Sequence, residues 1–116
     1  MILCAVDDLL FSVKISTAAR ALGADVYFER SAANVLPAIR EKRPALVIFD
    51  LNSTRLDPLA AIAALKADSE LAATRTLGYV SHVDAATIEA ARTAGIDQVL
   101  ARSAFAERLG EILTRA

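Results

Sequence analysis

The chain has 116 residues, 55% of them hydrophobic, which is typical of one packed domain and outside the range of disordered chains. Its formal net charge is −1, with acidic and basic residues mixed along the chain, which argues against a nucleic-acid-binding surface and against a polybasic membrane anchor. The single cysteine, Cys4, excludes an internal disulfide, and its place in an apolar run predicts a buried, inert thiol.

Apolar runs are far shorter than the roughly 20 residues that a membrane-spanning helix needs. The chain passes from Met1 directly into a strand-like run, without the charged region and cleavage site of a signal peptide. We therefore expect a soluble cytoplasmic protein.

The first half of the chain alternates short apolar runs with segments of helical spacing. The apolar runs indicate strands, and the spaced segments indicate helices. In chain order the pattern predicts a strand at 2–6, a helix at 9–22 ended by Gly23, a strand at 25–28, a helix capped by Ser31 with Pro37 in or just after its first turns, and a strand at 45–49.

The second half continues the alternation. Asp57-Pro58 is typical of a helix cap followed by proline at the first helical position, and Asp84 is a second candidate cap. In chain order we expect a helix from 58 to about 67, an irregular segment at 68–75, a strand at 76–80, a helix from Asp84 to Gly95, a strand at 98–101, and one final helix with the apolar stripe Phe105, Leu109, Ile112 and Leu113.

Five strand–helix units in succession predict an α/β fold with a parallel sheet and helices on both faces. The strand at 45–49 is an unbroken apolar run, as expected for a strand buried on both faces. No linker or repeat interrupts the pattern, so we expect a single domain over 1–116 without an effector domain.

Polar side chains follow four of the five expected strands. Because ligands bind beyond the carboxyl ends of parallel strands, these residues are expected at one edge of the sheet: Asp7, Asp8, Asp50, Ser81 and Arg102. Three carboxylates in one place repel each other unless a cation lies among them. Oxygen ligands favour a hard ion such as Mg²⁺, and an aspartate beside such an ion, a hydroxyl and a cationic side chain is equipped to accept a phosphoryl group.

The chain resembles the receiver (CheY-like, response-regulator) domains of two-component phosphorelay signalling over essentially all of its length. No single motif is specific, and the order and spacing of the motifs carry the resemblance. The matching residues are Val6-Asp7-Asp8, Asp50, Asn52, Leu56-Asp57, Ser81, Ala94-Gly95 and Phe105. The resemblance implies a flavodoxin-like, doubly wound (βα)₅ fold with strand order 2-1-3-4-5.

The resemblance also implies roles. Asp50 is the expected phospho-acceptor, and Ser81 is the expected switch hydroxyl. Mg²⁺ would be held by Asp8, Asp50 and the backbone carbonyl of Asn52, with Asp7 holding a water of the metal shell. The expected partners are a histidine kinase or phosphotransfer protein, and a downstream protein that contacts the fourth helix, fifth strand and fifth helix. Catalysis would be limited to Mg²⁺-dependent self-phosphorylation and autodephosphorylation.

The sequence departs from the family at several positions. Arg102-Ser103 stands where the family has lysine and proline, so Arg102 either clamps a phosphoryl oxygen or pairs with Asp50 and hinders phosphorylation. Ser53-Thr54 replaces Met-Pro, Pro58 replaces a glycine, and Val99 stands at an aromatic switch position. The loop between Ser81 and Gly95 is one residue shorter than usual, which leaves the alignment of Ser81 open by one position.

Other functions remain as alternatives. A pseudo-receiver would keep the fold and act as a phosphorylation-independent interaction module. Asp50-Leu51-Asn52-Ser53-Thr54 also resembles the nucleophile loop of haloacid-dehalogenase-like phosphatases, but Asn52 cannot serve as the general acid there. A flavodoxin-like cofactor binder is disfavoured because Asp7 and Asp8 would repel a phosphate. His82 is expected to be an exposed loop residue rather than a phosphotransfer residue, and a homodimer is left open.

Overall fold

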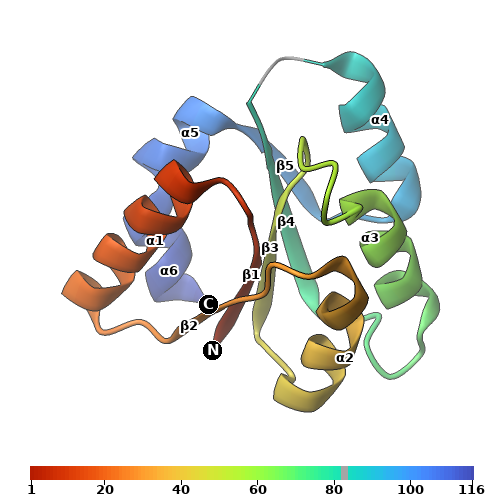
Figure 1. Cartoon of the computed structure of the whole chain (residues 1–116), viewed down its shortest axis with the longest axis horizontal. Coiled ribbons are helices and arrows are strands. Elements are labelled where there is room, and N and C mark those ends of the chain that lie inside the picture. The colour runs from red at the N-terminus through yellow and green to blue at the C-terminus, as the bar shows by residue number, and fades with distance from the viewer. Residues whose placement is uncertain (82–83) are drawn as a thin grey trace.

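The structure, a computed structural model, describes residues 1–81 and 84–116, which contain five strands and six helices (Figure 1). In chain order these are β1 (Ile2–Ala5), α1 (Leu9–Leu22), β2 (Val26–Phe28), α2 (Ala32–Lys42), β3 (Leu46–Asp50), α3 (Pro58–Ala67), β4 (Arg75–Val80), α4 (Ala85–Ala94), β5 (Gln98–Ala101), α5 (Arg102–Glu107) and α6 (Leu109–Arg115).

All neighbouring strands are parallel, and they form one sheet in the order β2-β1-β3-β4-β5. This confirms the predicted α/β class and the predicted strand order. Each of the five expected strands is present with ends within one residue of the prediction. The prediction succeeds because the continuous apolar runs, which indicate strands, and the segments with apolar residues at helical spacing, which indicate helices, occupy separate parts of this chain.

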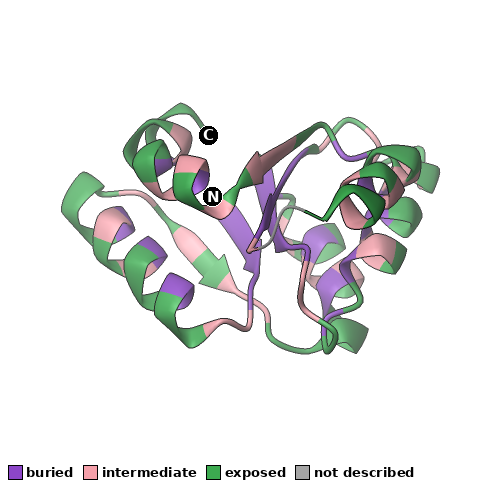
Figure 2. Ribbon diagram, turned by 90° about the horizontal axis from the view of Figure 1, so that it is seen from above, coloured by how far each residue is buried: buried purple, intermediate pink, exposed green. Residues whose placement is uncertain are grey.

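The sheet lies between two layers of helices. Its central strand, β3, is buried along its whole length, and Figure 2 shows the buried sheet between helices whose outer faces are exposed. One apolar cluster joins the sheet to α1, α5 and α6 through Phe11, Ile15, Phe105, Leu109 and Leu113. The other cluster joins the opposite face to α2, α3 and α4 through Val35, Ile39, Ile62, Leu65 and Ala91.

Helix caps follow the sequence signals in part. The Asp84 carboxylate accepts from the amides of Ala86 and Thr87, and Gly23 and Gly95 end their helices in the left-handed conformation. The side chains expected to cap α2 and α3 make no such bond: Ser31 and Asp57 precede these helices without a cap hydrogen bond. Asp57 has φ 46°, and in this conformation its side chain does not accept from the first-turn amides.

One helical detail agrees with the prediction and another differs. Pro37 lies inside α2 just after its first turn, as expected, and the helix continues past this residue, which cannot donate a backbone hydrogen bond. The expected single final helix is divided at Arg108, which has φ −94° and ψ 5°. Phe105, Leu109 and Leu113 are nevertheless all buried. The apolar spacing continues across the break, and for that reason the pattern alone does not reveal it.

None of the helices in the described ranges is long and apolar enough to cross a membrane.

Candidate functional site at the carboxyl edge of the sheet

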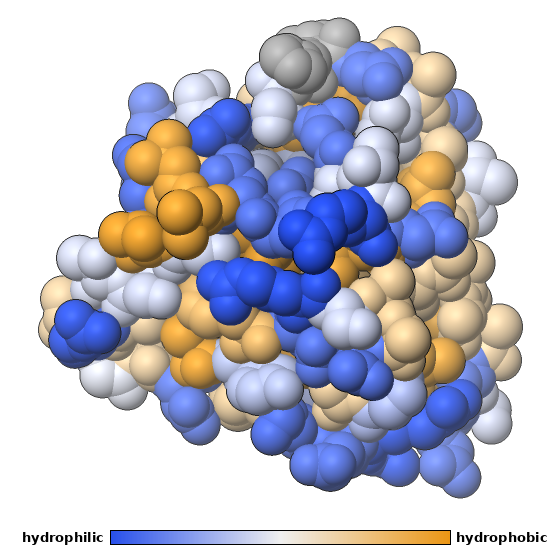
Figure 3. Space-filling model, viewed as in Figure 1, coloured by the Kyte–Doolittle hydropathy of each residue, from blue (hydrophilic) through white to orange (hydrophobic). Residues whose placement is uncertain are grey.

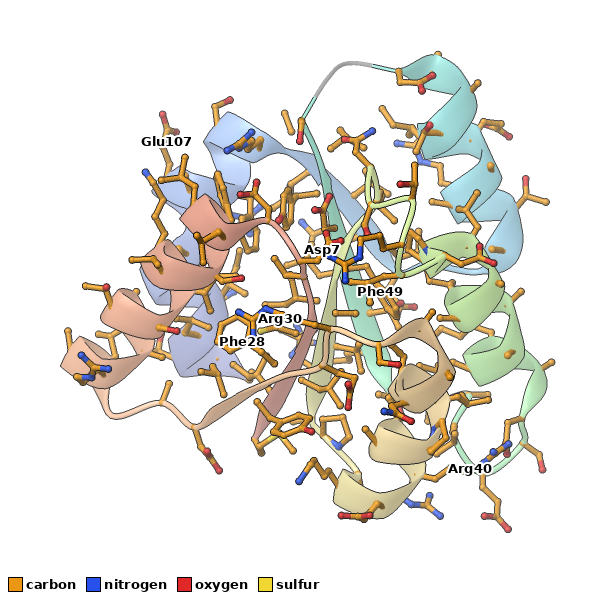
Figure 4. The ribbon with its side chains drawn as sticks, in the orientation of Figure 1. Asp7, Phe28, Arg30, Arg40, Phe49 and Glu107 are labelled. Carbon is orange, nitrogen blue, oxygen red and sulfur yellow. The ribbon has the colours of Figure 1, made fainter. Side chains whose placement is uncertain are left out.

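The strands bring the predicted polar residues to one edge of the sheet. Asp7 and Asp8 follow β1, Asp50 is the last residue of β3, Ser81 follows β4 and Arg102 follows β5. Figure 4 labels Asp7 beyond the end of β1 and shows the polar side chains that gather around this edge. The grouping follows from the parallel sheet, because every strand ends on the same side.

Asp50 is the most buried of these acids, with 5% of its surface exposed. It is in register with Tyr79 of β4, so both side chains point to the face covered by α1 and α5. Burial raises the pKa of Asp50, the amide of Asn52 lowers it by donating to Oδ1 at 3.1 Å, and the neighbouring Asp7 and Asp8 raise it further. The net direction is upward, although the charge of Arg102 acts against it.

The two carboxylate oxygens of Asp8 have different partners. Its Oδ1 caps α1 by accepting from the amides of Leu10 and Phe11 at 3.0 and 3.3 Å. Its Oδ2 lies 3.4 Å from Nη2 of Arg102. Asp8 is therefore both the helix cap of α1 and the ion-pair partner of Arg102.

Arg102 lies between Asp8 and an aromatic ring. Its guanidinium carbon is 4.3 Å from the centroid of Phe11, which is within the range of a cation–π contact. The ion pair considered from the sequence was with Asp50, whereas the structure forms it with Asp8. The physical reason is the position of Phe11. The guanidinium of Arg102 lies over this ring, which brings it beside the start of α1, where Asp8 lies.

Asn52 connects the loops that follow β3 and β4. Its side-chain Oδ1 accepts from the backbone amide of Ser81 at 2.6 Å. The sequence assigned Asn52 a role through its backbone carbonyl, so this side-chain connection was not anticipated. It holds the half-buried Ser81 next to the Asp50 loop. The Ser81 hydroxyl has no hydrogen-bond partner among the described residues.

Gly78 allows the Asp50 loop to pack closely on β4. A Cβ atom at Gly78 would lie 2.7 Å from Leu51 Cγ and 2.8 Å from Ile96 Cδ1. The structure shows that its missing side chain gives Leu51, the residue after the candidate acceptor, room to be buried against the sheet.

The donor chemistry of the site fits a hard divalent cation. The carboxylates of Asp7 and Asp8 lie near enough to that of Asp50 to raise its pKa. A cation among the three would relieve the repulsion between their charges. In the conformation described, however, no group of three or more His, Cys, Asp or Glu residues within 1–81 and 84–116 is arranged to hold a metal ion. Asp8 is turned to Arg102, while Asp7 has no hydrogen bond or ion pair with the described residues.

Three aromatic rings pack together beside the acids, an arrangement that the sequence did not predict. Phe11 and Phe105 each stack on Tyr79, with centroid distances of 5.1 and 4.8 Å, and their own centroids are 6.0 Å apart. The hydroxyl of Tyr79 is buried and has no hydrogen-bond partner in the described part of the chain. Burial is the main cause that raises the pKa of Tyr79, and the charges of Asp50 and Asp8 raise it further. Helical and strand periodicity predict that these rings are buried, but not that they stack together beside the acids.

A groove of about 530 Å³ lies beside the site, between α1 and α5. Ser81 and Arg102 form part of its wall, together with Leu10, Phe11, Lys14, Val80, Ala101, Ser103 and Ala106. The first turns of α1 also carry the exposed apolar side chains of Leu9, Leu10 and Val13, which form the orange patch at the upper left of Figure 3. His82, which the sequence placed next to the site, lies outside the described residues.

Comparison with models of protein families gives no match, and comparison with curated protein sequences gives none either.

Comparison with solved structures does give matches, and the three described here are distant in sequence. A response regulator from Hahella chejuensis superposes with a TM-score of 0.86 at 16% identity, covering 97% of this chain and 91% of that one. The receiver domain of NtrX from Brucella abortus gives 0.81 at 22% identity, with coverage of 99% and 96%. The Mn²⁺-bound form of the response regulator Rcp1 gives 0.80 at 14% identity, with coverage of 96% and 89%. The chain therefore has the CheY-like fold found in these response-regulator receiver domains.

Proposed function

We propose that this chain is a receiver module of a phosphorelay, which accepts a phosphoryl group on Asp50 and signals through contacts with other proteins. The observation that carries the proposal is the placement of Asp50. It is a buried carboxylate at the end of the central strand, with two further acids, an arginine and a serine from three other strand ends around it. The fold shared with receiver domains supports the same conclusion.

The proposed step is an attack by an Asp50 carboxylate oxygen on the phosphorus of a donor. The new O–P bond forms as the bond from phosphorus to the donor breaks, and the donor's leaving group takes the electron pair of that bond. Return to the resting state is hydrolysis, in which water attacks phosphorus and releases inorganic phosphate. Asp50 must be ionised for the attack, so a nearby cation would help by offsetting the burial and the neighbouring acids that raise its pKa.

Each neighbour of Asp50 has a proposed task. Asp7, Asp8, Asp50 and the backbone carbonyl of Asn52 would hold Mg²⁺, which when bound supplies positive charge that neutralises the phosphoryl oxygens. Ser81 would donate its hydroxyl to a phosphoryl oxygen. Its hydroxyl has no partner among the described residues, and the Asn52 side chain holds its backbone in place. Arg102 would contact a phosphoryl oxygen in place of a lysine.

The proposed partners follow from this role. A histidine kinase or phosphotransfer protein would supply the phosphoryl group, and a downstream protein would contact the surface of α4, β5 and α5. Phosphorylation would shift the population of two packings of that surface. We place the module in the cytoplasm, without nucleic acid or a membrane as partner and without catalysis beyond self-phosphorylation and autodephosphorylation. A homodimer remains an open alternative.

The test is phosphorylation in solution. We expect incubation with acetyl phosphate and Mg²⁺ to add one phosphoryl group, seen by intact-protein mass spectrometry, and expect the added mass to be absent in Asp50→Asn. Beryllofluoride should bind the same site in the presence of Mg²⁺. Glu107→Gln, an exposed acid on α5 away from the carboxylate edge, is a matched control that should behave as the wild type. No mass shift and no beryllofluoride binding, for both the wild type and Arg102→Lys, would contradict phosphorylation.

A second candidate function has an observation in its favour. Asp8 and Arg102 are ion-paired, and the Asn52 side chain ties the loop after β3 to the loop after β4. A domain held in this way is suited to a constant, phosphorylation-independent interaction. The mass-spectrometry test separates the two functions, because only the phospho-acceptor gains mass.

A further inference from the structure

We propose that Arg102 is a built-in cation that competes with a divalent metal ion for Asp8, so that metal binding requires Arg102 to leave the carboxylate. The inference rests on the proposed function for the identity of the metal site. The competition itself follows from the contacts that Asp8 and Arg102 make in this chain.

The first step concerns the oxygens of Asp8. Oδ1 is engaged by two amides at the start of α1, and that capping bond fixes the carboxylate in position. Oδ2 is the oxygen not used by the cap, and it is the one that faces Arg102 at 3.4 Å. A metal ion that uses Asp8 must therefore share this oxygen with a guanidinium or displace it. Two cations in contact with one carboxylate oxygen repel each other.

The second step concerns what holds Arg102 in place. Its guanidinium lies over the Phe11 ring, and that ring stacks against Tyr79 and packs beside Phe105. The side chains of Arg102 and Asp8 are 33% and 23% exposed, so water screens their attraction less than at an open surface. Arginine is also weakly hydrated and flat, which suits a site between a carboxylate and a ring. The aromatic cluster thus gives the arginine a second attachment that is independent of Asp8.

The third step concerns why a different cation would compete less. A lysine at position 102 would carry a compact, strongly hydrated charge and would lack the planar guanidinium that lies over Phe11. Magnesium gives up its water reluctantly, so it gains most from a carboxylate with no other cation bound to it. We therefore expect metal affinity to increase when the planar group is lost, and to increase most when the charge is lost as well.

The experiment is a calorimetric titration with Mg²⁺ alone, without a phosphoryl donor. We expect Arg102→Ala to bind Mg²⁺ about tenfold more tightly than the wild type, since removal of a competing half-buried charge is worth roughly that factor. Arg102→Lys should fall between the two. Arg108→Ala is the matched control: Arg108 lies at the other end of α5 and also makes an ion pair, with Glu111 at 3.7 Å, but it is not among the residues around the carboxylates.

A spectroscopic readout follows the arginine itself. The Phe11 ring current should shift the Arg102 side-chain proton resonances upfield in the metal-free wild type. Titration with Mg²⁺ should return them toward the values of a solvated arginine. Far-UV circular dichroism of each variant checks folding, and the resonance shift in the wild type tests the proposal even if Arg102→Ala does not fold.

Three outcomes would overturn the inference. They are an Arg102→Ala affinity equal to or weaker than that of the wild type, no Mg²⁺ binding by any folded variant, and Arg102 resonances that do not move while Mg²⁺ binds. Tighter binding by Arg102→Ala together with a failed phosphorylation test would leave the competition standing and refute only the phospho-acceptor role. Phosphorylation of the wild type, together with unchanged metal affinity in Arg102→Ala, would refute the competition and leave the phospho-acceptor role standing.

Discussion

Aspartates lie at both ends of the parallel sheet, and their surroundings have opposite effects on them. At the carboxyl edge Asp50 is buried near two other acids, and burial, Asp7 and Asp8 raise its pKa. Asp97, which precedes β5 at the amino edge, is also partly desolvated, but hydrogen bonds from Thr76 and Lys66 outweigh that effect and its pKa is lowered. Three donors meet at its Oδ2: the Thr76 amide and hydroxyl at 2.8 and 2.9 Å and Lys66 Nζ at 3.1 Å.

The difference separates a structural acid from a candidate functional one. The hydrogen-bond network around Asp97 extends further, because Lys66 also donates to the carbonyls of Ala72 and Thr74, and the Asp97 amide donates to Thr76 Oγ1. It ties α3, β4 and the start of β5 together. Asp50 instead has one amide donor and two like charges near it. A charge that the fold does not fully compensate is available to bind a cation or accept a phosphoryl group.

The largest expected effect on stability comes from removing the hydrogen bonds to Asp97 at the amino edge of the sheet. Asp97→Ala removes the acceptor for Thr76 and Lys66, so we expect unfolding by urea to show a loss of about 2 kcal/mol, in line with leaving partly buried donors without a partner. Because the pKa of Asp97 is lowered, its contribution is present above the ordinary range near pH 4 and is lost as the pH falls through its folded value.

The control for this variant is Glu107→Ala, which changes an exposed acid and should leave stability nearly unchanged. Equal effects of the two substitutions would show that the Asp97 network contributes little to the fold.

At the carboxyl edge of the sheet, removal of the Asp50 charge is expected to increase stability rather than to lower it. Asp50→Asn keeps an oxygen for the Asn52 amide and removes a charge that is unfavourable in the folded state. The raised pKa means that the folded protein holds a proton on Asp50 at pH values where the unfolded chain has lost it. Wild-type stability therefore falls as the pH rises from about 4 through the folded pKa of Asp50.

We expect the melting temperature of Asp50→Asn to exceed that of the wild type by about 5 °C at neutral pH. The gain should shrink as the pH is lowered toward 4, where the wild-type carboxyl is protonated in both states. A melting temperature that is lower than that of the wild type at neutral pH would contradict the assignment of Asp50 as an uncompensated acid.

A smaller effect is expected from the hydroxyl beneath the acids. Tyr79→Phe removes a buried oxygen that has no partner among the described residues and keeps the stacked ring, so we expect a gain of about 0.5–1 kcal/mol in urea unfolding. Tyr27→Phe is a matched control, because Tyr27 is exposed and its hydroxyl donates to Glu29 at 3.2 Å. A loss of stability in Tyr79→Phe would show that the hydroxyl has a hydrogen-bond partner in solution.

Local signals predicted much of the site as well as the fold. Asp84 was an expected helix cap because an acid directly before a helical segment is a short-range pattern, and the structure forms that cap. Ser31 and Asp57 carried the same kind of signal, yet their side chains make no cap bond, since capping also depends on the angle at which the chain enters the helix. The break at Arg108 was hidden because the spacing of buried residues continues across it.

The sequence by itself determined the order of strands and helices and the set of polar residues at the strand ends. Both depend on periodicity and on the rule that parallel strands end on one side, which are properties of short segments and of their connections. Only the tertiary structure decided which of those residues pair. Arg102 meets Asp8 rather than Asp50, Asn52 reaches Ser81 with its side chain, and Tyr79 stacks with both Phe11 and Phe105.

These pairings depend on how α1, α5 and the strand-end loops pack together in three dimensions. A sequence pattern carries no information on that packing, because residues far apart in the chain are brought together only by the folded core. For this reason the sequence could place an arginine near three acids, while the structure was needed to show that it holds Asp8, the oxygen donor a metal ion would need.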